Sequence, residues 1–425
     1  MKRIDYILDF CKELGKQMIA CGANIERVDL CIEHLCHAYG LHDVTCANLT
    51  TRISISAKDE EKNYAHRQTD VPPQTINLER LKELNHLYYK VKDETPDVTT
   101  LYDLLHGVTS NDFPWWVILI GYLVAMAALS RIFNAGPFEL LAIEANTLIL
   151  FGLSKLSAKI HLNKIVTNFV SMFICSCLAM LLFKIGAINN IYVVIITNAF
   201  FLVPGIQMVN CARNLLCGNE MNGIIDLFKV VLEVCTIVAG VAAAYALMGD
   251  FIGKPLIEDY VNPNPGAPDL IHIFELVFMT LLASLGFGVC FNIQLKDLAF
   301  AGIGGVIVRV VYVLLQLAIP QYRFVLITVA AFFASLYAVI LGIKKKEPST
   351  LYLYPSVVPL IPGDLFLYFG LGLICGNGYV ATYGPDLALS LIGISVGFVI
   401  SSTVVHYVKK AKFFKIIMNT NQNNK

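Results

Sequence analysis

The chain has 425 residues, of which 56% are hydrophobic and only 15% are charged. That composition provides too little polar surface for a soluble globular protein of this length, so the soluble class is excluded. The sequence therefore predicts an integral membrane protein surrounded by a lipid bilayer. The formal net charge is zero and no long basic run occurs, so nothing indicates nucleic-acid binding.

The first 113 residues differ from the rest because charges of both signs are spread through them. Hydrophobic periodicity predicts two helices here, over 4–20 and 25–39, with Asn24 as the cap of the second. Later patterns predict strands over 44–48, 52–57 and 63–68 and helices over 77–92 and 97–107. The first thirty residues carry too many charges for a cleavable signal peptide. We expect residues 1–113 to form a small cytoplasmic α+β domain.

Cysteine and histidine are dense in one part of this region, at Cys31, His34, Cys36, His37, His42 and Cys46. Their spacing matches no CxxC pair, so no metal site is predicted. A helix with buried cysteines and exposed histidines is favoured, and metal binding is the alternative. The region has no GxSxG, Gly-rich phosphate loop or HExxH. No catalytic residue and no cofactor is predicted, and a membrane-anchored sensor or enzyme stays an alternative.

From Pro114 onward the chain consists of apolar stretches separated by short gaps. Most of them reach the roughly 20 residues that a membrane-spanning helix needs. Ten segments are predicted, over 114–131, 138–154, 165–183, 189–217, 224–248, 271–291, 298–317, 323–342, 351–375 and 386–408.

A short motif occurs twice in these spans. LVPG at 202–205 returns as LIPG at 360–363, and Cys-Gly-Asn at 217–219 returns at 375–377, each 158 residues later. The offset places five spans in each copy, and an odd number inverts the second copy relative to the first. The predicted fold is therefore α-helical, with ten transmembrane helices as a 5+5 inverted repeat. Its parts are the first repeat 114–249, an external loop 250–270, the second repeat 271–411 and a cytoplasmic tail 412–425.

Lysine and arginine are distributed unevenly over the connections between spans. If residue 113 is cytoplasmic, the outer connections carry only Arg131, Lys184, Lys254 and Arg323. The inner connections carry Lys155, Lys159, Lys164, Arg213, Lys296, Lys344, Lys345, Lys346, Lys409, Lys410, Lys412 and Lys415. Since positive charge collects on the cytoplasmic side, both termini are predicted to be cytoplasmic and the protein to lie in the cell membrane.

Proline followed by glycine interrupts a helix, because proline lacks an N–H and clashes with the preceding turn. Pro204-Gly205 and Pro362-Gly363 therefore predict two broken spans. In lipid a break is tolerated only where protein or a polar cavity surrounds the freed backbone. Broken spans at matching places in two repeats indicate a substrate-binding site.

Polar residues after each break are further candidates for substrate binding. Asn210 and Arg213 lie one turn apart, with Asn214 beside them. Asp364 directly follows the second break, where a helix N-terminus favours negative charge. A simple helix cap is its alternative role.

Arg309 is the cation deepest in a predicted span, about 16 Å from the start of its segment. Ionisable groups are costly at this depth and usually face the interior of a helix bundle or water. Arg309 is therefore a candidate for binding a substrate carboxylate, with a structural ion pair as the alternative.

Three carboxylates in the spans are candidates for proton coupling: Glu144, Glu233 and Asp226. An apolar environment makes a carboxylate easier to protonate, as a proton-coupled carrier requires. Asp226 lies near the cytoplasmic end, where an interfacial position is the alternative. Glu139 and Glu275 lie nearer the outer face and are expected to be solvated. The residues alone do not choose between the candidates.

The chain resembles the threonine/serine exporter family. The resemblance covers nearly the whole chain and includes the soluble region before ten spans. Its sequence features are Gly22-Ala23 with Glu26-Arg27 and the run FFLVPGIQMVNCARNLLCGN at Phe200–Asn219 followed by Gly223. It implies a transporter, not an enzyme, that exports threonine and serine using the proton motive force. Asn214 stands where many relatives carry an aspartate, which leaves its role open.

The substrate has an alternative, since some relatives divide the same architecture between two chains and are linked to succinate export. An amino acid needs a cation for its carboxylate and an anion for its ammonium group, whereas a dicarboxylate needs mainly cations. Deep acids outnumber deep bases in this chain, which favours the amino acid. A passive channel and association into a homo-oligomer also stay open.

Overall fold

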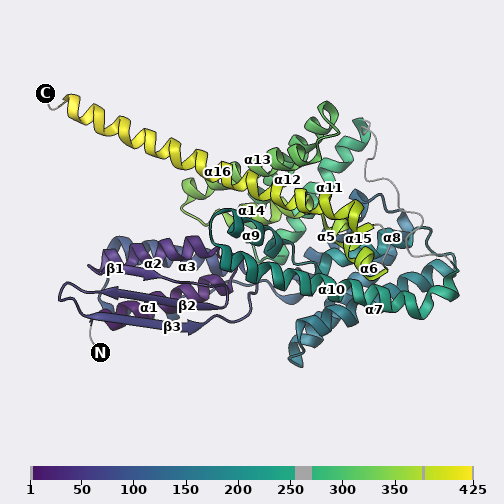
Figure 1. Cartoon of the computed structure of the whole chain (residues 1–425), viewed down its shortest axis with the longest axis horizontal. Helices are drawn as coiled ribbons and strands as arrows, with labels where there is room; N and C mark the ends of the chain where they lie inside the picture. Colours follow the sequence, from purple (N-terminus) through teal and green to yellow (C-terminus); the bar gives the residue numbers. More distant parts are fainter. Residues whose placement is uncertain (1–2, 254–269, 376–378, 424–425) are drawn as a thin grey trace. The chain divides into compact units, whose positions relative to one another are not determined.

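The computed structural model describes residues 3–253, 270–375 and 379–423, shown in Figure 1. The predicted external loop 250–270 and the second Cys-Gly-Asn triplet, 375–377, fall largely outside these residues. The chain divides into two compact units. Unit 1 is Met1–Ile118, Gly288–Leu298 and Leu341–Tyr352, and unit 2 is Leu119–Phe287, Ala299–Ile340 and Leu353–Lys425.

Unit 1 contains a three-stranded antiparallel sheet in the order β1 (His42–Cys46), β2 (Arg52–Lys58), β3 (Tyr64–Asp70). Alternate side chains on a strand point to opposite faces, so Ile53, Ile55 and Ala57 share one face and are fully buried. This face packs against α1 (Arg3–Ala20). All three predicted strands are confirmed to within two residues at each end.

The predicted helices of this region are also confirmed. They are α1, α2 (Ile25–Ala38), α3 (Leu78–Glu94) and the short pair η1 (Val98–Thr100) and α4 (Leu101–His106). Asn24 caps α2 as predicted, because its Oδ1 accepts the Glu26 N–H at 2.9 Å. Cys31 and Cys36 are buried inside unit 1, whereas His34 and His37 are exposed on the other side of the same helix. These four side chains therefore do not converge on one point.

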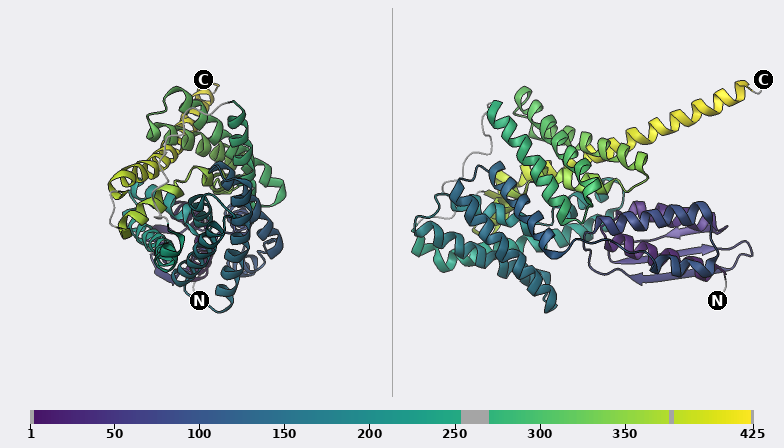
Figure 2. Two further views of the ribbon diagram at one scale, coloured as in Figure 1. Left: turned by 90° about the vertical axis from the view of Figure 1, so that its right-hand side faces the viewer. Right: turned by 180° about the vertical axis from the view of Figure 1, so that it is seen from behind.

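Eight unbroken helices in the described part of the chain are long and apolar enough to span a bilayer. They are α5 (Trp115–Ile132), α6 (Pro137–Lys159), α7 (Lys164–Lys184), α10 (Glu220–Ile252), α11 (Leu270–Cys290), α12 (Leu295–Ala318), α13 (Arg323–Lys345) and α16 (Tyr379–Asn423). Figure 2 shows them from two further directions. Their number makes the protein a multi-pass membrane protein.

Two further spans are bent. α8 (Ile191–Leu202) and α9 (Gly205–Leu216) form one span that is bent by 64° at Pro204. α14 (Thr350–Val357), extended by η2 (Val358–Leu360), meets α15 (Gly363–Cys375) at 56°. Each bent pair passes the length and hydropathy test for one span, which gives between eight and ten spans in the described residues. Both predicted helix breaks are thus confirmed.

Candidate functional site

The two breaks have the same local geometry. The Gly205 N–H donates to the Val203 carbonyl at 2.8 Å, and the Gly363 N–H donates to the Ile361 carbonyl at 2.9 Å. Each bond closes a tight turn around the intervening proline, which has no N–H of its own. The chain then enters α9 or α15, whose first N–H groups have no carbonyl partner within the helix.

The two breaks lie against each other in unit 2. A Cβ atom on Gly205 would be 2.7 Å from Ile361 Cδ1, and one on Gly363 would be 2.5 Å from the Phe200 ring. Each glycine is therefore contacted by the other broken span, at a distance that leaves no room for a side chain. Pro204 is buried as well. The repeated motif thus brings its two copies together in space, although they are 158 residues apart.

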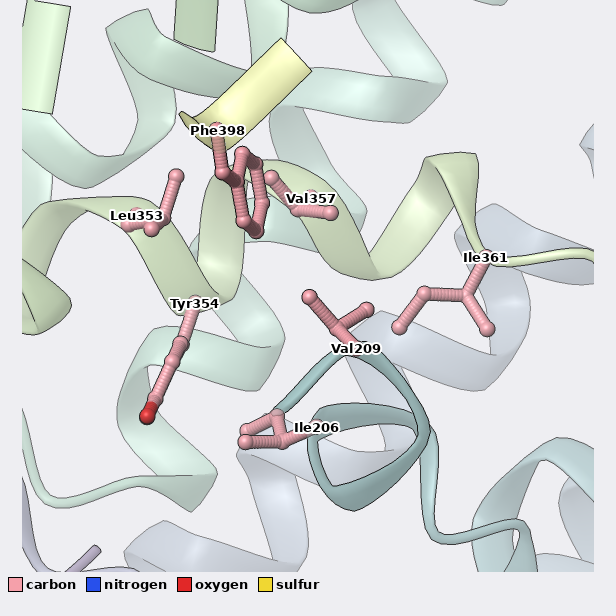
Figure 3. Close-up of a pocket in the computed structure, with 7 residues that line it drawn as sticks. All are labelled: Ile206, Val209, Leu353, Tyr354, Val357, Ile361 and Phe398. Atoms are coloured by element: carbon pink, nitrogen blue, oxygen red, sulfur yellow. The ribbon is translucent and has the colours of Figure 1, made fainter. Parts of the chain in front are cut away.

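A small hollow opens beside this contact, as Figure 3 shows. Ile206 and Val209 of α9 line one side of it, and the other lining residues come from the second broken span and α16: Leu353, Tyr354, Val357, Ile361 and Phe398. It has room for about one water molecule. In this conformation the hollow is therefore too small for an amino acid.

Polar side chains lie next to the hollow. Asn210 of α9 donates from Nδ2 to the Tyr354 hydroxyl of α14 at 3.2 Å, which joins the two broken spans. Tyr354 also interacts electrostatically with Arg213 and Asp226. Asn214 donates to Asp226 Oδ2 at 3.2 Å. The structure thus brings together four candidate residues predicted from the sequence, and it adds Tyr354, which no local sequence signal indicates.

Asp364 lies in the first turn of α15 and is half-buried. Among the described residues no N–H or O–H donates to its carboxylate, so the hydrogen bond that its capping role requires is not formed. A free carboxylate at this position is available to a cationic group.

Glu139 anchors the start of the first broken span. It is only 5% exposed, and its Oε1 accepts the backbone N–H groups of Asn189 and Asn190 at 2.7 and 3.1 Å. The expectation that Glu139 is solvated is therefore wrong: it satisfies N–H groups of the turn that enters α8. Glu275 is half-buried and pairs with Arg131 at 2.5 Å.

Two buried carboxamides lie further along the same helices. The hydrogen bond from Asn189 to Glu139 places the start of α8 beside the start of α6. Asn146 on α6 and Asn198 on α8 each lie about 10–13 Å along their helix from that point, so they lie at a similar depth. Asn198 is 1% exposed and, among the described residues, neither of its amide atoms has a hydrogen-bond partner. Asn146 donates to the Cys175 carbonyl at 3.3 Å, but its Oδ1 has none there. Buried amides without partners are costly, so this level is suited to a polar ligand or water.

Gln207, directly after the first break, has the same property. Its Oε1 is buried and has no hydrogen-bond partner in the described part of the chain. Sequence reasoning missed Gln207 and Asn198 because an uncharged amide in an apolar run gives no signal until its neighbours are known.

Arg309 lies on α12 and is half-buried. Its Nε donates to Thr280 Oγ1 of α11 at 2.8 Å, and Thr280 itself is fully buried. Within the described residues Arg309 forms no ion pair, so the predicted structural alternative is not realised there. Thr280, which accepts this hydrogen bond, lies on α11, and α11 is not part of either broken span.

The three candidate acids have different surroundings. Glu233 accepts two hydrogen bonds from Lys164 at 2.7 and 2.9 Å and is neutralised by that pair. Asp226 is 6% exposed and accepts from Asn214. Glu144 differs, because its Oε1 is buried without a hydrogen-bond partner among the described residues.

Comparison with known proteins identifies the class as a family of membrane exporters. A threonine/serine exporter family model matches residues 9–248, and a second threonine/serine exporter model matches residues 276–404. The first match alone covers more than half of the chain, so the protein belongs to the threonine/serine exporter family. No curated protein and no solved structure matches it. Members of this family are transporters rather than enzymes, which sets aside the reading as a membrane-anchored enzyme.

Gly363→Ala tests the contact between the breaks. The added methyl group would lie 2.5 Å from the Phe200 ring, so the ring or the two spans must shift. Overpacking of this kind costs roughly 1–3 kcal/mol, and we expect the rate of threonine export per inserted molecule to fall about tenfold. Adding Phe200→Leu should restore part of the rate.

Gly152→Ala is the matched control, because nothing lies within 4 Å of a Cβ atom at that position. It should export at the normal rate. An unchanged rate in Gly363→Ala would show that the close contact of the two breaks is not needed for transport.

Proposed function

We propose that the chain is a secondary transporter that exports threonine and serine from the cytoplasm by alternating access, coupled to the proton motive force. The observation that carries this proposal is the pair of opposed breaks in unit 2, where each glycine packs against the other broken span and the Asn210–Tyr354 pair lies next to a hollow. Helix N-termini present free N–H groups that favour a carboxylate. The two breaks with their polar neighbours are the proposed central site.

The 5+5 inverted repeat belongs to the same proposal, and contacts at matched positions support it. The ring centroids of Tyr122 and Phe151 are 6.1 Å apart. Thr280 and Arg309, which stand 158 positions after these two residues, are likewise in contact, through a hydrogen bond. Asn134 and its counterpart Asn292 both have a φ of 60°, which is rare for a residue other than glycine. Matched positions with matched geometry are expected if the halves share one fold.

We further propose the domain layout and orientation that the charge distribution predicts. Residues 1–113 and the tail 412–425 would then lie in the cytoplasm, 114–249 and 271–411 would be the two repeats, and 250–270 would be external. In this orientation export carries the substrate from the side of the N-terminal region to the side of residues 250–270.

Asp364 favours an amino acid over a dicarboxylate. A carboxylate without a partner in the described residues would attract the substrate's ammonium group and repel a second carboxylate. The N-termini of α9 and α15 would hold the substrate carboxylate, and the Asn210–Tyr354 pair offers both a donor and an acceptor to the hydroxyl of threonine or serine. A dicarboxylate exporter is the second candidate, favoured by the cations Arg213 and Arg309.

Glu144 is the proton carrier that we propose. A carrier must gain and lose its proton during the cycle, and an acid held in an ion pair, such as Glu233, resists protonation. Glu144 has no such partner among the described residues. Asp226 remains the second candidate because it lies with the polar residues after the first break.

The proposal is tested by efflux from proteoliposomes loaded with labelled threonine, serine or succinate, with and without an imposed pH gradient. We expect gradient-dependent loss of threonine and serine. Loss of succinate alone would show that the substrate is a dicarboxylate. Flux that does not depend on the pH gradient would indicate a passive channel.

Arg309→Ala should reduce threonine export to background while the protein remains inserted, because a deep cation without an ion-pair partner serves the substrate pathway. Thr280→Val is the matched control, since it removes the hydrogen bond to Arg309 and keeps the charge, and it should cause a smaller loss. Normal export by Arg309→Ala would remove Arg309 from the pathway.

Glu144→Gln should abolish the response of export to the pH gradient. Movement of threonine down its own concentration gradient should remain. Glu233→Gln should keep the gradient response, because Lys164 already neutralises that acid. The measurement is the ratio of initial rates with and without the gradient. If Glu144→Gln keeps the response and Asp226→Asn loses it, the carrier is Asp226.

A further inference from the structure

Lys82, on α3 of unit 1, is buried in contact with two carboxylates from far along the chain. Its side chain is 3% exposed, and its Nζ lies 2.5 Å from Asp297 Oδ2 and 2.9 Å from Glu347 Oε1. Asp297 is at the start of α12, and Glu347 is in the link between α13 and α14. One lysine therefore joins the N-terminal region to two separate turns of unit 1.

A second cation and a hydroxyl complete the cluster. Lys345 Nζ lies 2.7 Å from Asp297 Oδ1, and the Tyr352 hydroxyl of α14 donates to Glu347. The two lysines and two carboxylates that touch one another carry no net charge. Such a network is stable only when complete, because removing one partner leaves a buried charge uncompensated.

The charge of Lys82 is maintained in this environment. Burial by itself would lower the pKa of Lys82, but hydrogen bonds to Asp297 and Glu347 outweigh it and raise the pKa above the usual value for lysine. Burial also raises the pKa of Glu79, one turn earlier on α3, which lies near Lys82. Lys82 is therefore charged at physiological pH.

Hydrogen bonds on either side of Lys82 hold the same two turns. The Leu78 N–H donates to the Phe291 carbonyl at 2.9 Å, beside the turn that enters α12. Asn85 Nδ2 donates to the Lys346 carbonyl at 3.0 Å, in the turn that enters α14. One face of α3 thus binds both turns, with the Lys82 cluster between these bonds.

The turn at 189–190, which corresponds to the turn at 347–348, is held differently in the first half of the chain. Glu139 is 158 residues before Asp297, and it accepts the N–H groups of Asn189 and Asn190, which are 158 residues before Glu347 and Pro348. In both halves, an acid near the start of one helix anchors the turn that leads into a broken span. Asp297 does so together with Lys82, a side chain of the N-terminal region.

We infer that Lys82 is a positioning residue for the second broken span: through Asp297 and Glu347 it holds the entry to α14, so that residues 1–113 take part in setting the position of this span. α14 continues from Thr350 towards the break at Pro362. Loss of the Lys82 contacts frees the entry turn and, with it, the first half of the span.

The experiment is hydrogen–deuterium exchange of the full-length protein in nanodiscs, read over residues 345–357, together with the rate of threonine export. The test variant combines Lys82→Met with Glu347→Gln, which removes one charge of each sign and leaves the Lys345–Asp297 pair intact. Exchange over 345–357 should accelerate about tenfold or more, with β2 still protected, and export should slow. The exchange measurement needs no substrate, so it stands independently of the proposed function.

Lys90→Met is the matched control, because Lys90 lies on the same helix and is exposed. Its exchange and export should be unchanged. A second variant changes the sign of the charge: Lys82→Glu places a third carboxylate against Asp297 and Glu347 and should accelerate exchange further than Lys82→Met with Glu347→Gln. Unchanged exchange over 345–357 in the Lys82→Met, Glu347→Gln variant would overturn the inference.

Discussion

A bilayer cannot hydrogen-bond the backbone, and the arrangement of the spans depends on this constraint. Among the described residues, eight helices satisfy it by pairing their N–H and C=O groups internally, but Pro204-Gly205 and Pro362-Gly363 each interrupt that pairing. The two breaks are shielded because each packs against the other broken span, Gly205 on Ile361 and Gly363 on Phe200. Protein rather than lipid thereby surrounds the backbone at the starts of α9 and α15.

Buried charge is the second constraint, and it separates structural groups from candidate functional ones. Lys82, Asp297, Glu347 and Lys345 neutralise one another and tie two turns to the N-terminal region. Arg309, by contrast, has a threonine hydroxyl but no ion-pair partner in the described residues. A protein that places charges in an apolar interior without pairing them bears a free-energy cost, and such groups concentrate at functional sites.

The elements of the fold could be predicted because their signals are local. Alternation of apolar residues located β2, and continuous apolar runs located most spans to within a few residues. The last span was predicted over 386–408, whereas α16 runs from Tyr379 to Asn423. The breaks were predictable because proline and glycine act on the helix that contains them. Glu139 was assigned wrongly for the same reason: position in the chain suggested solvent, while the N–H groups that it binds come from Asn189 and Asn190, fifty residues later.

The sequence by itself determined that the chain lies in a membrane, that two spans are broken and that the breaks repeat, because composition and proline act at short range. Only the tertiary structure decided what surrounds them. Tyr354 meets Asn210 across 144 residues, and Lys82 meets Asp297 across 215. Which polar groups become partners depends on how the helices pack, since a side chain's hydrogen-bond partners are set by distance in space and not by distance along the chain.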